Sequence, residues 1–259
     1  MTCLTVLHAR LPRGPLRWMA MLLLAALVAG CAAPKPAAPA LQSLAATRWT
    51  ALEQAAWQEV HFPAKTPTAY SLDTQAPPNS SGQRTALKAN AQSSASMLRT
   101  PVRIEPADLS RLSFSWLVPA LIDKADMAQR DLDDSPVRVV LAFEGDRSTF
   151  SPKNAMLNEL TRLVSGEEMP YATLMYVWCN QRPVGSVIHN PRTDRIRKIV
   201  VESGARGLKQ WNSYERDIRA DFERAFGEAP GALVGIGLMT DSDNTQSNAV
   251  AWYGPIALR

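Results

Sequence analysis

Apolar and polar residues alternate with a period of two in many short segments of the chain, a pattern typical of half-buried β-strands. In residues 112–118 large side chains alternate with serines, and in residues 137–143 every second residue is large and apolar. Residues 174–178 are apolar on both faces, as in a strand that is covered twice. Further strands are predicted at residues 60–63, 68–73, 85–91, 96–104, 186–189 and 196–202.

The stretch Leu233–Ile256 combines two such segments with a polar loop between them. Apolar residues alternate on both sides of this loop, which carries Asp241, Asp243 and Asn244. Period two on each side of a turn-rich loop predicts an antiparallel hairpin. The loop holds the densest set of oxygen donors near the end of a core strand, so we expect a functional site there.

Two segments have a helical period instead. The first begins at Ser151–Pro152, a typical N-cap and first helical residue, and ends at Gly166. The second covers residues 213–226, with Asn212 and Glu215 as a capping pair. Each carries an apolar stripe that we expect to pack on the core. The stripes are Met156, Leu160, Leu163 and Val164 in the first segment, and Tyr214, Ile218, Phe222 and Phe226 in the second.

The predicted elements therefore amount to about ten short strands and two helices, with no regular strand–helix alternation. This order favours a mainly β fold, an antiparallel β-sandwich of the jelly-roll kind with two peripheral helices. We expect the domain to occupy residues 49–259.

The segment before this domain has the features of an export signal. A region with three arginines precedes the apolar residues 19–28, which are too few for a confident membrane span. Val28–Cys31 then resembles a bacterial lipobox, which implies that residues 1–30 are removed and that Cys31 is lipidated, with palmitate among its acyl chains. An ordinary signal peptide or an uncleaved anchor, with Cys31 incidental, is the alternative.

The same interpretation predicts a location in the cell envelope. Residues 31–48 are rich in Ala and Pro and form a tether between the lipid and the domain. Ala32 follows the cysteine where Asp would retain the protein, which favours the outer membrane, facing the periplasm. Loss of three arginines lowers the net charge from +4 to about +1, and no footprint of nucleic-acid binding remains.

Two acidic loops hold the candidate chemistry. Asp133 and Asp134 precede the strand that carries Arg138, and they could act as a ligand-binding group, as an acid–base pair of a glycosidase, or as ordinary strand-end residues. Asp241 and Asp243, two residues apart, could converge with neighbouring oxygens on a calcium ion, or could simply form a turn. Asn244 belongs to the same loop and is a further candidate for ligand binding.

Aromatic residues offer a second candidate surface. Trp211 is free of an obvious core pattern and is a candidate for stacking on a sugar, whereas Trp116, Trp178 and Trp252 occupy strand positions that we expect to face inward. The other reactive side chains are uninformative. Cys179 lies in an apolar run as a structural thiol, the histidines lack metal-ligand spacing, and no nucleophile elbow, P-loop or dinucleotide fingerprint is present. We assign no catalytic residue.

Several motifs occur in an order that resembles one known family. They are Tyr70, Ser94–Leu98, Leu112–Trp116, Asp133–Asp134 before Val137–Val139, Tyr176–Trp178, Trp211, Arg216–Asp217, Asp221, Phe226–Gly227, Gly235–Met239, Thr240–Thr245 and Trp252–Gly254. From Trp57 to Leu258 the chain resembles the bacterial secreted and lipoprotein family of domain of unknown function 3047. Ser135 and Pro255 depart from its pattern. The resemblance implies an exported β-sandwich and no particular activity.

The sequence therefore leads to three hypotheses. We expect a lipid-anchored, non-catalytic domain that binds a ligand, with a glycan as the first candidate ligand and calcium as the one candidate metal. The first alternative is a hydrolase or lyase on envelope polysaccharide that uses Asp133, Asp134, Asp241 or Asp243. The second is a structural envelope protein that binds another protein.

Overall fold

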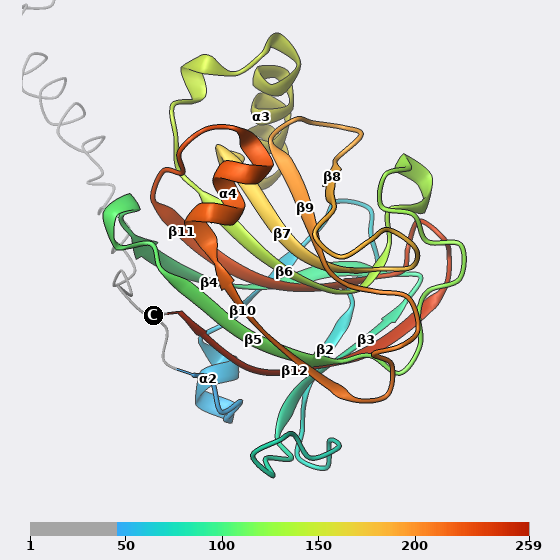
Figure 1. Ribbon diagram of the computed structural model, residues 1–259. Coiled ribbons are helices and arrows are strands. Elements are labelled where there is room, and N and C mark those ends of the chain that lie inside the picture. Colours follow the sequence, from blue (N-terminus) through green and yellow to red (C-terminus); the bar gives the residue numbers. More distant parts are fainter. Residues whose placement is uncertain (1–45, 259) are drawn as a thin grey trace, which may run out of the picture. The chain divides into compact units, whose positions relative to one another are not determined.

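The computed structural model describes residues 46–258, so the predicted signal peptide and all but the last residues of the tether lie outside the described residues. The described chain forms two β-sheets (Figure 1). In spatial order, the seven-stranded sheet contains β1 (Gln58–His61), β4 (Ala95–Ile104), β11 (Leu233–Asp241), β6 (Ser135–Phe143), β7 (Ala172–Cys179), β9 (Ile196–Ser203) and β8 (Val187–His189). The five-stranded sheet contains β10 (Trp211–Asp217), β5 (Arg111–Leu117), β12 (Asn248–Leu258), β3 (Ala86–Gln92) and β2 (Ala69–Asp73).

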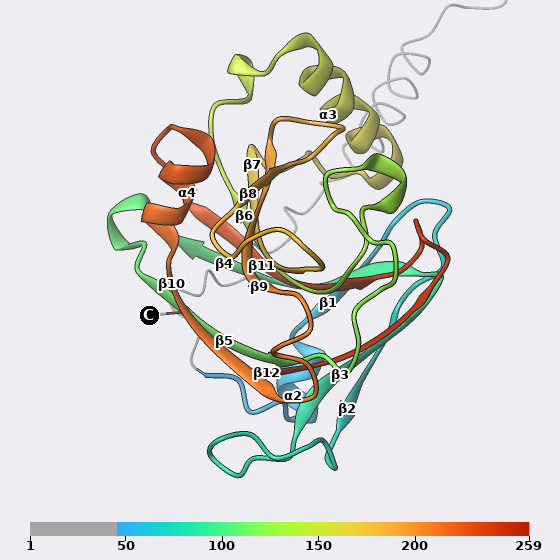
Figure 2. The ribbon, with the colours of Figure 1, turned by 45° about the vertical axis from the view of Figure 1, so that its right-hand side comes forward.

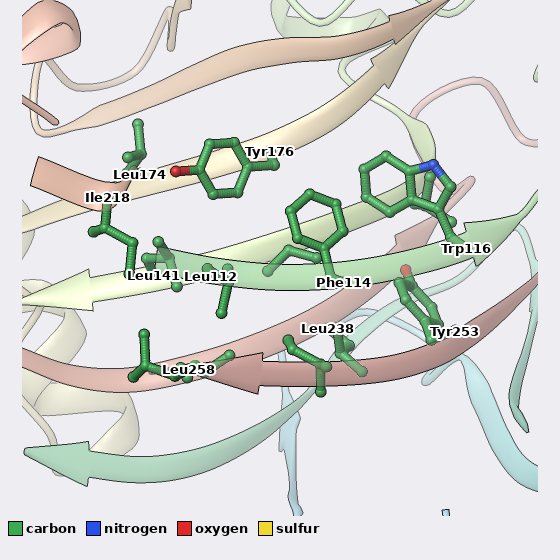
Figure 3. Packing of buried hydrophobic residues seen from close by; sticks show 14 of the residues in the cluster. Leu112, Phe114, Trp116, Leu141, Leu174, Tyr176, Ile218, Leu238, Tyr253 and Leu258 are labelled. Carbon is green, nitrogen blue, oxygen red and sulfur yellow. The ribbon is translucent and has the colours of Figure 1, made fainter. Parts of the chain in front are cut away.

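The core lies between the two sheets, because alternate residues of each sheet point toward the other (Figure 3). Phe114 of β5 stacks on Tyr176 of β7 with ring centroids 5.5 Å apart. Trp116 and Trp178 are buried, as the period of their strands predicts. All strand pairs are antiparallel except β7 and β9, which are parallel. The predicted fold class, a mainly β sandwich of antiparallel strands, is confirmed.

The predicted hairpin over Leu233–Ile256 is wrong, although both of its strands exist. β11 pairs with β4 and β6 in one sheet, and β12 pairs with β3 and β5 in the other. The loop between them, Ser242–Ser247, therefore passes from one sheet to the other. Alternation marks each strand but does not identify its hydrogen-bonding neighbour.

The helix predicted over residues 213–226 is correct only in its second half. Its first residues belong to β10, which pairs along its whole length with β5. Tyr214 faces the core, 5.3 Å from the rings of Phe114 and Trp116, so tertiary packing overrides the helical spacing. The helix α4 (Ile218–Phe226) begins after Asp217, whose carboxylate accepts a hydrogen bond of 3.0 Å from the Ala220 amide. Asn212 is not its cap.

The remaining helices are α2 (Ala51–Ala55) and α3 (Pro152–Ser165), and single 3₁₀ turns lie at Pro106–Asp108, Arg130–Leu132 and Arg147–Thr149. Ser151 caps α3 and Gly166 ends it in the left-handed conformation, as predicted. The predicted packing of its apolar stripe is wrong, because the whole stripe is exposed to solvent. None of the helices formed by residues 46–258 is both long and apolar enough to span a membrane.

The two longer helices should therefore differ in how much stability the protein loses when one of their apolar side chains is removed. Phe222 of α4 is fully buried, with its ring 4.7 Å from that of Phe143, so we expect Phe222→Ala to lower the free energy of unfolding by about 3–5 kcal/mol. Leu160 of α3 is exposed, so Leu160→Gln should change it by less than about 0.5 kcal/mol. Urea unfolding followed by tryptophan fluorescence measures both, and equal losses would contradict the packing described here.

Candidate functional site

The two acidic loops lie side by side at one end of the seven-stranded sheet. β6 and β11 are antiparallel, so the start of β6 is next to the end of β11, and Asp241 is in register with Ser135. This register brings Asp133 and Asp134 to the same place as Asp241. The Ser135 amide donates a hydrogen bond of 3.1 Å to the Asp241 carboxylate.

Arg138 is the centre of this cluster. From its buried position on β6 it forms a bidentate pair with Asp241 of β11, with Nε and Nη2 each 2.8 Å from a different carboxylate oxygen. Its Nη2 atom also donates to the backbone oxygen of Asp133 at 2.8 Å and to the side chain of Asp133 at 3.2 Å. The Arg138 guanidinium thus joins the end of β11 to the loop that precedes β6.

Lys198 of β9 is the member of the cluster that sequence reasoning missed. Its buried ammonium lies 2.6 Å from both carboxylate oxygens of Asp133 and 3.0 Å from the backbone oxygen of Met127. A signal was available in the sequence, because Lys198 lies between the apolar Ile196 and Val200 on one face of its strand. A lone cation on an apolar face must find a buried partner.

Asp134 holds the loop that joins the two sheets. Its carboxylate accepts four hydrogen bonds, from the backbone amides of Asn244 and Thr245 at 3.1 and 2.7 Å, and from their side chains at 2.9 and 2.6 Å. In the same loop Asp243 forms an ion pair with Lys65. The loop is therefore fixed from both sides.

Charge in the buried cluster is closely but incompletely balanced, because three carboxylates face two cations. Burial alone would raise the pKa of Asp133, but Arg138 and Lys198 hold it below its usual value. Burial raises the pKa of Asp241 to about 7 against the opposing charge of Arg138, with Asp134 and Asp133 adding to the rise. Burial lowers the pKa of Lys198 to about 8. The charge of Arg138 also lowers this pKa, whereas the charge of Asp133 raises it.

These carboxylates have the spacing of a cation site but not its free ligands. One oxygen each of Asp134, Asp241 and Asp243 lies within 4.8 Å of the others. Every one of these side chains already accepts hydrogen bonds or pairs with a cation. A calcium ion takes six to eight oxygen ligands, and here it would compete with Arg138 and Lys65. The donor set fits its protein partners better than it fits calcium.

The same contacts speak against acid–base chemistry in the cluster. A glycosidase places its two carboxyl groups on either side of a substrate cleft, whereas Asp133, Asp134 and Asp241 are buried. Two hollows that the described residues form, of about 350 and 450 Å³, lie elsewhere. The first is around Glu144 and Arg147 and the second around Asp126 and Cys179, which is a buried free thiol.

Trp211 is the one candidate that the structure places away from the cluster. It is in register with Leu117 of β5, and Leu117 is also in register with Trp252 of β12. Residues directly opposite in antiparallel strands share a face, and Tyr214 and Tyr253 show that the other face points into the core. Trp211, Leu117 and Trp252 therefore form a row on the outer face of the five-stranded sheet, so the expectation that Trp252 faces inward is wrong.

A register shift explains this error. The pairing of β12 with β5 slips between Tyr253 and Ile256. The phase of the alternation changes there, so that Trp252 faces out while Ile256, four residues later, faces in and is buried.

Both indole rings extend across the sheet rather than away from it. A Cβ atom on Gly254 of β12 would lie 3.0 Å from Cζ3 of Trp211, so the Trp211 ring reaches from β10 over β5 to β12. The Trp252 ring reaches over β3, where the Lys88 ammonium lies 5.5 Å from its centroid, to Asp73 of β2. We call this row of two rings the indole strip.

Hydrogen bonds fix both rings of the indole strip. Trp211 Nε1 donates to the backbone oxygen of Pro77 at 2.7 Å, and Trp252 Nε1 donates to the Asp73 carboxylate at 2.8 Å. The bond from Trp252 also holds the pKa of Asp73 below its usual value. Both tryptophans remain partly exposed.

The fold and these two features define a β-sandwich with a buried ion-pair cluster at one end and an aromatic strip on one outer face. The chain belongs to a family described as protein of unknown function, DUF3047, whose model matches residues 55–257. The family expected from the sequence motifs is thereby confirmed. No protein with a curated description matches the sequence.

Solved structures share only a distant likeness with the chain. The xyloglucanase domain of NopAA from Sinorhizobium fredii has a TM-score of 0.43 at 8% identity, covering 78% of this chain and 92% of that one. The family 11 carbohydrate-binding module from Clostridium thermocellum has 0.38 at 7%, covering 85% and 96%. The Endo-D glycoside hydrolase domain from Streptococcus pneumoniae R6 has 0.33 at 8%, and the chain, 78% of which is covered, spans 21% of its length. Likenesses at this level carry no argument about function.

The buried cluster generates a stability prediction. Arg138→Met leaves Asp241 buried without its cation and leaves Asp133 with Lys198 alone, so it should lower the free energy of unfolding by about 3–5 kcal/mol. Arg99→Met is the matched control, because Arg99 lies in the same sheet but pairs with Glu167 at the surface, and it should cost about 1 kcal/mol or less. Urea unfolding compares the two, and similar small losses would show that the cluster does not hold the fold.

Calcium provides a second test of the cluster. Because its carboxylates are already engaged, we expect millimolar calcium to leave the melting temperature of the protein unchanged relative to a chelator. A ligand that binds only the native state must raise it. Lys65→Met, which removes the cation beside Asp243, is the variant in which calcium would first gain affinity. A rise in the wild type that disappears in Asp241→Asn would contradict our assignment and establish a metal site.

Proposed function

We propose that this protein is a lipid-anchored domain of the bacterial cell envelope that binds a glycan on the outer face of its five-stranded sheet, without catalysis. The observation that carries the proposal is the indole strip. Two partly exposed tryptophans from different strands lie in one row, with their rings laid across the sheet.

Such a strip suits the chemistry of a sugar. The faces of a pyranose ring carry C–H groups that pack on a flat aromatic ring, while its hydroxyl groups need polar partners around the rim. Neighbouring strands lie about 4.8 Å apart, so Trp211 and Trp252, two strands apart, have backbones roughly 10 Å apart. Two sugars of one chain that are separated by a third sugar can cover that span.

Polar side chains border the strip on the same face. Lys88 is opposite Trp252 on β3, and Asn90 is two residues further along that strand and therefore points the same way. Ser213 is two residues from Trp211 and is exposed. These groups can exchange hydrogen bonds with sugar hydroxyls. Because both rings are already fixed by their own hydrogen bonds, binding would order little of the protein.

The envelope location rests on the sequence before the domain. Arginines, an apolar stretch and small residues before Cys31 occur in the order of a lipoprotein signal, and Ala32 favours the outer membrane. In this proposal the lipid on Cys31 holds the domain at the periplasmic face, within reach of envelope polysaccharide. The hydrolase alternative has less support, because Asp133, Asp134 and Asp241 are buried and all four candidate carboxylates are engaged by protein partners.

The indole strip can be tested by binding to soluble polysaccharides. Affinity electrophoresis against a panel of neutral glucans, and calorimetry with peptidoglycan fragments, should identify a glycan that binds the wild type. Trp211→Ala and Trp252→Ala should each weaken that binding about tenfold or more, because each removes a stacking surface worth about 1.4 kcal/mol or more.

Val250→Ala is the matched control, because Val250 is on the same strand and face as Trp252 and is also partly exposed. It should bind the glycan as the wild type does. Failure of every glycan in the panel, or equal affinity of the tryptophan variants and the wild type, would overturn the proposal.

A further inference from the structure

Helix α3 turns its apolar side outward. Its stripe of four large side chains is exposed: Met156 by 66%, Leu160 by 56%, Leu163 by 78% and Val164 by 57%. Only one other large hydrophobic residue of the described chain, Val184, is counted among the exposed ones. A concentration of exposed apolar side chains on one helix face marks an interaction surface. We call these four residues the α3 face.

Polar contacts hold the opposite side of the helix. Asn154 and Asn158 are its buried residues. Asn154 accepts a hydrogen bond of 2.8 Å from Thr193 and donates one to Asp194, and Asn158 accepts one of 2.9 Å from the Met169 amide. Figures 1 and 2 show α3 at the outer margin of the fold. Rotation of the helix to bury its apolar side would break these bonds, so the α3 face is held toward the surroundings.

The dimensions of the helix limit what can cover it. α3 has 14 residues, so it is about 21 Å long and about 10 Å wide, and one face covers roughly 200 Å². A stable specific interface buries about 800 Å² per partner. The α3 face is thus too small to hold a second copy or a protein partner by itself. A lipid surface has no such threshold when a separate anchor already holds the domain close to it.

We propose that the α3 face lies on the surface of the lipid bilayer that carries the anchor of this protein. The inference rests on the lipid attachment proposed above and is independent of the indole strip. Fourteen residues lie between Cys31 and Ala46, a length that spans up to about 50 Å. A domain of about 210 residues is roughly 45 Å across, so the tether allows any side of it to reach the bilayer.

One basic residue of α3 suits the same position. Lys153 is exposed and lies three residues before Met156, on the side of the helix that carries the apolar stripe. In an interfacial helix such side chains extend their charged groups to lipid phosphates while the apolar face enters the acyl boundary.

The test uses the lipidated mature protein, which begins at Cys31 with its thiol blocked by the lipid, reconstituted in vesicles of phosphatidylethanolamine and phosphatidylglycerol. A polarity-sensitive fluorophore is attached at Leu160→Cys or, as the matched control, at Val184→Cys, since Val184 is 60% exposed and lies outside α3. Cys179 is buried and stays unlabelled. We expect a quencher carried in the lipid chains to reduce the emission of the first label severalfold more than that of the second, with aqueous iodide showing the reverse order.

Each other outcome overturns the inference in a distinguishable way. Equal quenching of both labels on vesicles would leave the anchor intact and remove the contact of α3. Protection of the Leu160→Cys label from both quenchers, in detergent as on vesicles, would assign the α3 face to contact with a second copy of the protein. Failure of the wild type to associate with the vesicles would overturn the anchoring and this contact together, while glycan binding would be unaffected.

Discussion

The bidentate ion pair between Arg138 and Asp241 is the contact on which the arrangement of the strands depends. It joins β6 to the end of β11, the point at which the chain leaves one sheet for the other. Lys198 of β9 pairs with Asp133, which brings β9 into the same cluster. Asp134 accepts four hydrogen bonds from the loop Ser242–Ser247, which passes from one sheet to the other. Three segments distant in sequence, at residues 133–138, 198 and 241–245, thus share one buried electrostatic network, which can be fully satisfied in only one register.

The second sheet is tied to the same point. Tyr253 of β12 donates a hydrogen bond of 2.6 Å to the Met239 backbone oxygen and accepts one of 3.3 Å from the Arg138 amide. Its inward direction sets the outward direction of Trp252, the residue beside it. The buried cluster and the indole strip are therefore connected through β12. The polar network sets the position of β12, and β12 presents one ring of the strip.

The sequence predicted the existence of strands well, because period two survives wherever one face is buried. It could not predict their partners, so a connection between sheets resembled a hairpin. Four-residue spacing in Tyr214–Phe226 suited a helix as well as it suited a strand followed by a short helix. The alternation assigned Trp252 to the wrong face, because a register shift between Tyr253 and Ile256 reverses its phase. The acidic residues of the cluster were predicted from their loops. The apolar neighbours of Lys198 indicate that it is buried, but they do not identify its partner, which is 65 residues away in the sequence.

The orientation of the indole strip has a consequence for the kind of polymer that it could hold. The rings run across the strands, from the edge strand β10 toward the opposite edge strand β2. In the glycan complex proposed above, a ligand laid along the rings would pass over both borders of the sheet and would require no chain terminus. The proposed site would thus select internal stretches of a long polysaccharide, and several copies of the protein would fit on one polysaccharide chain at once.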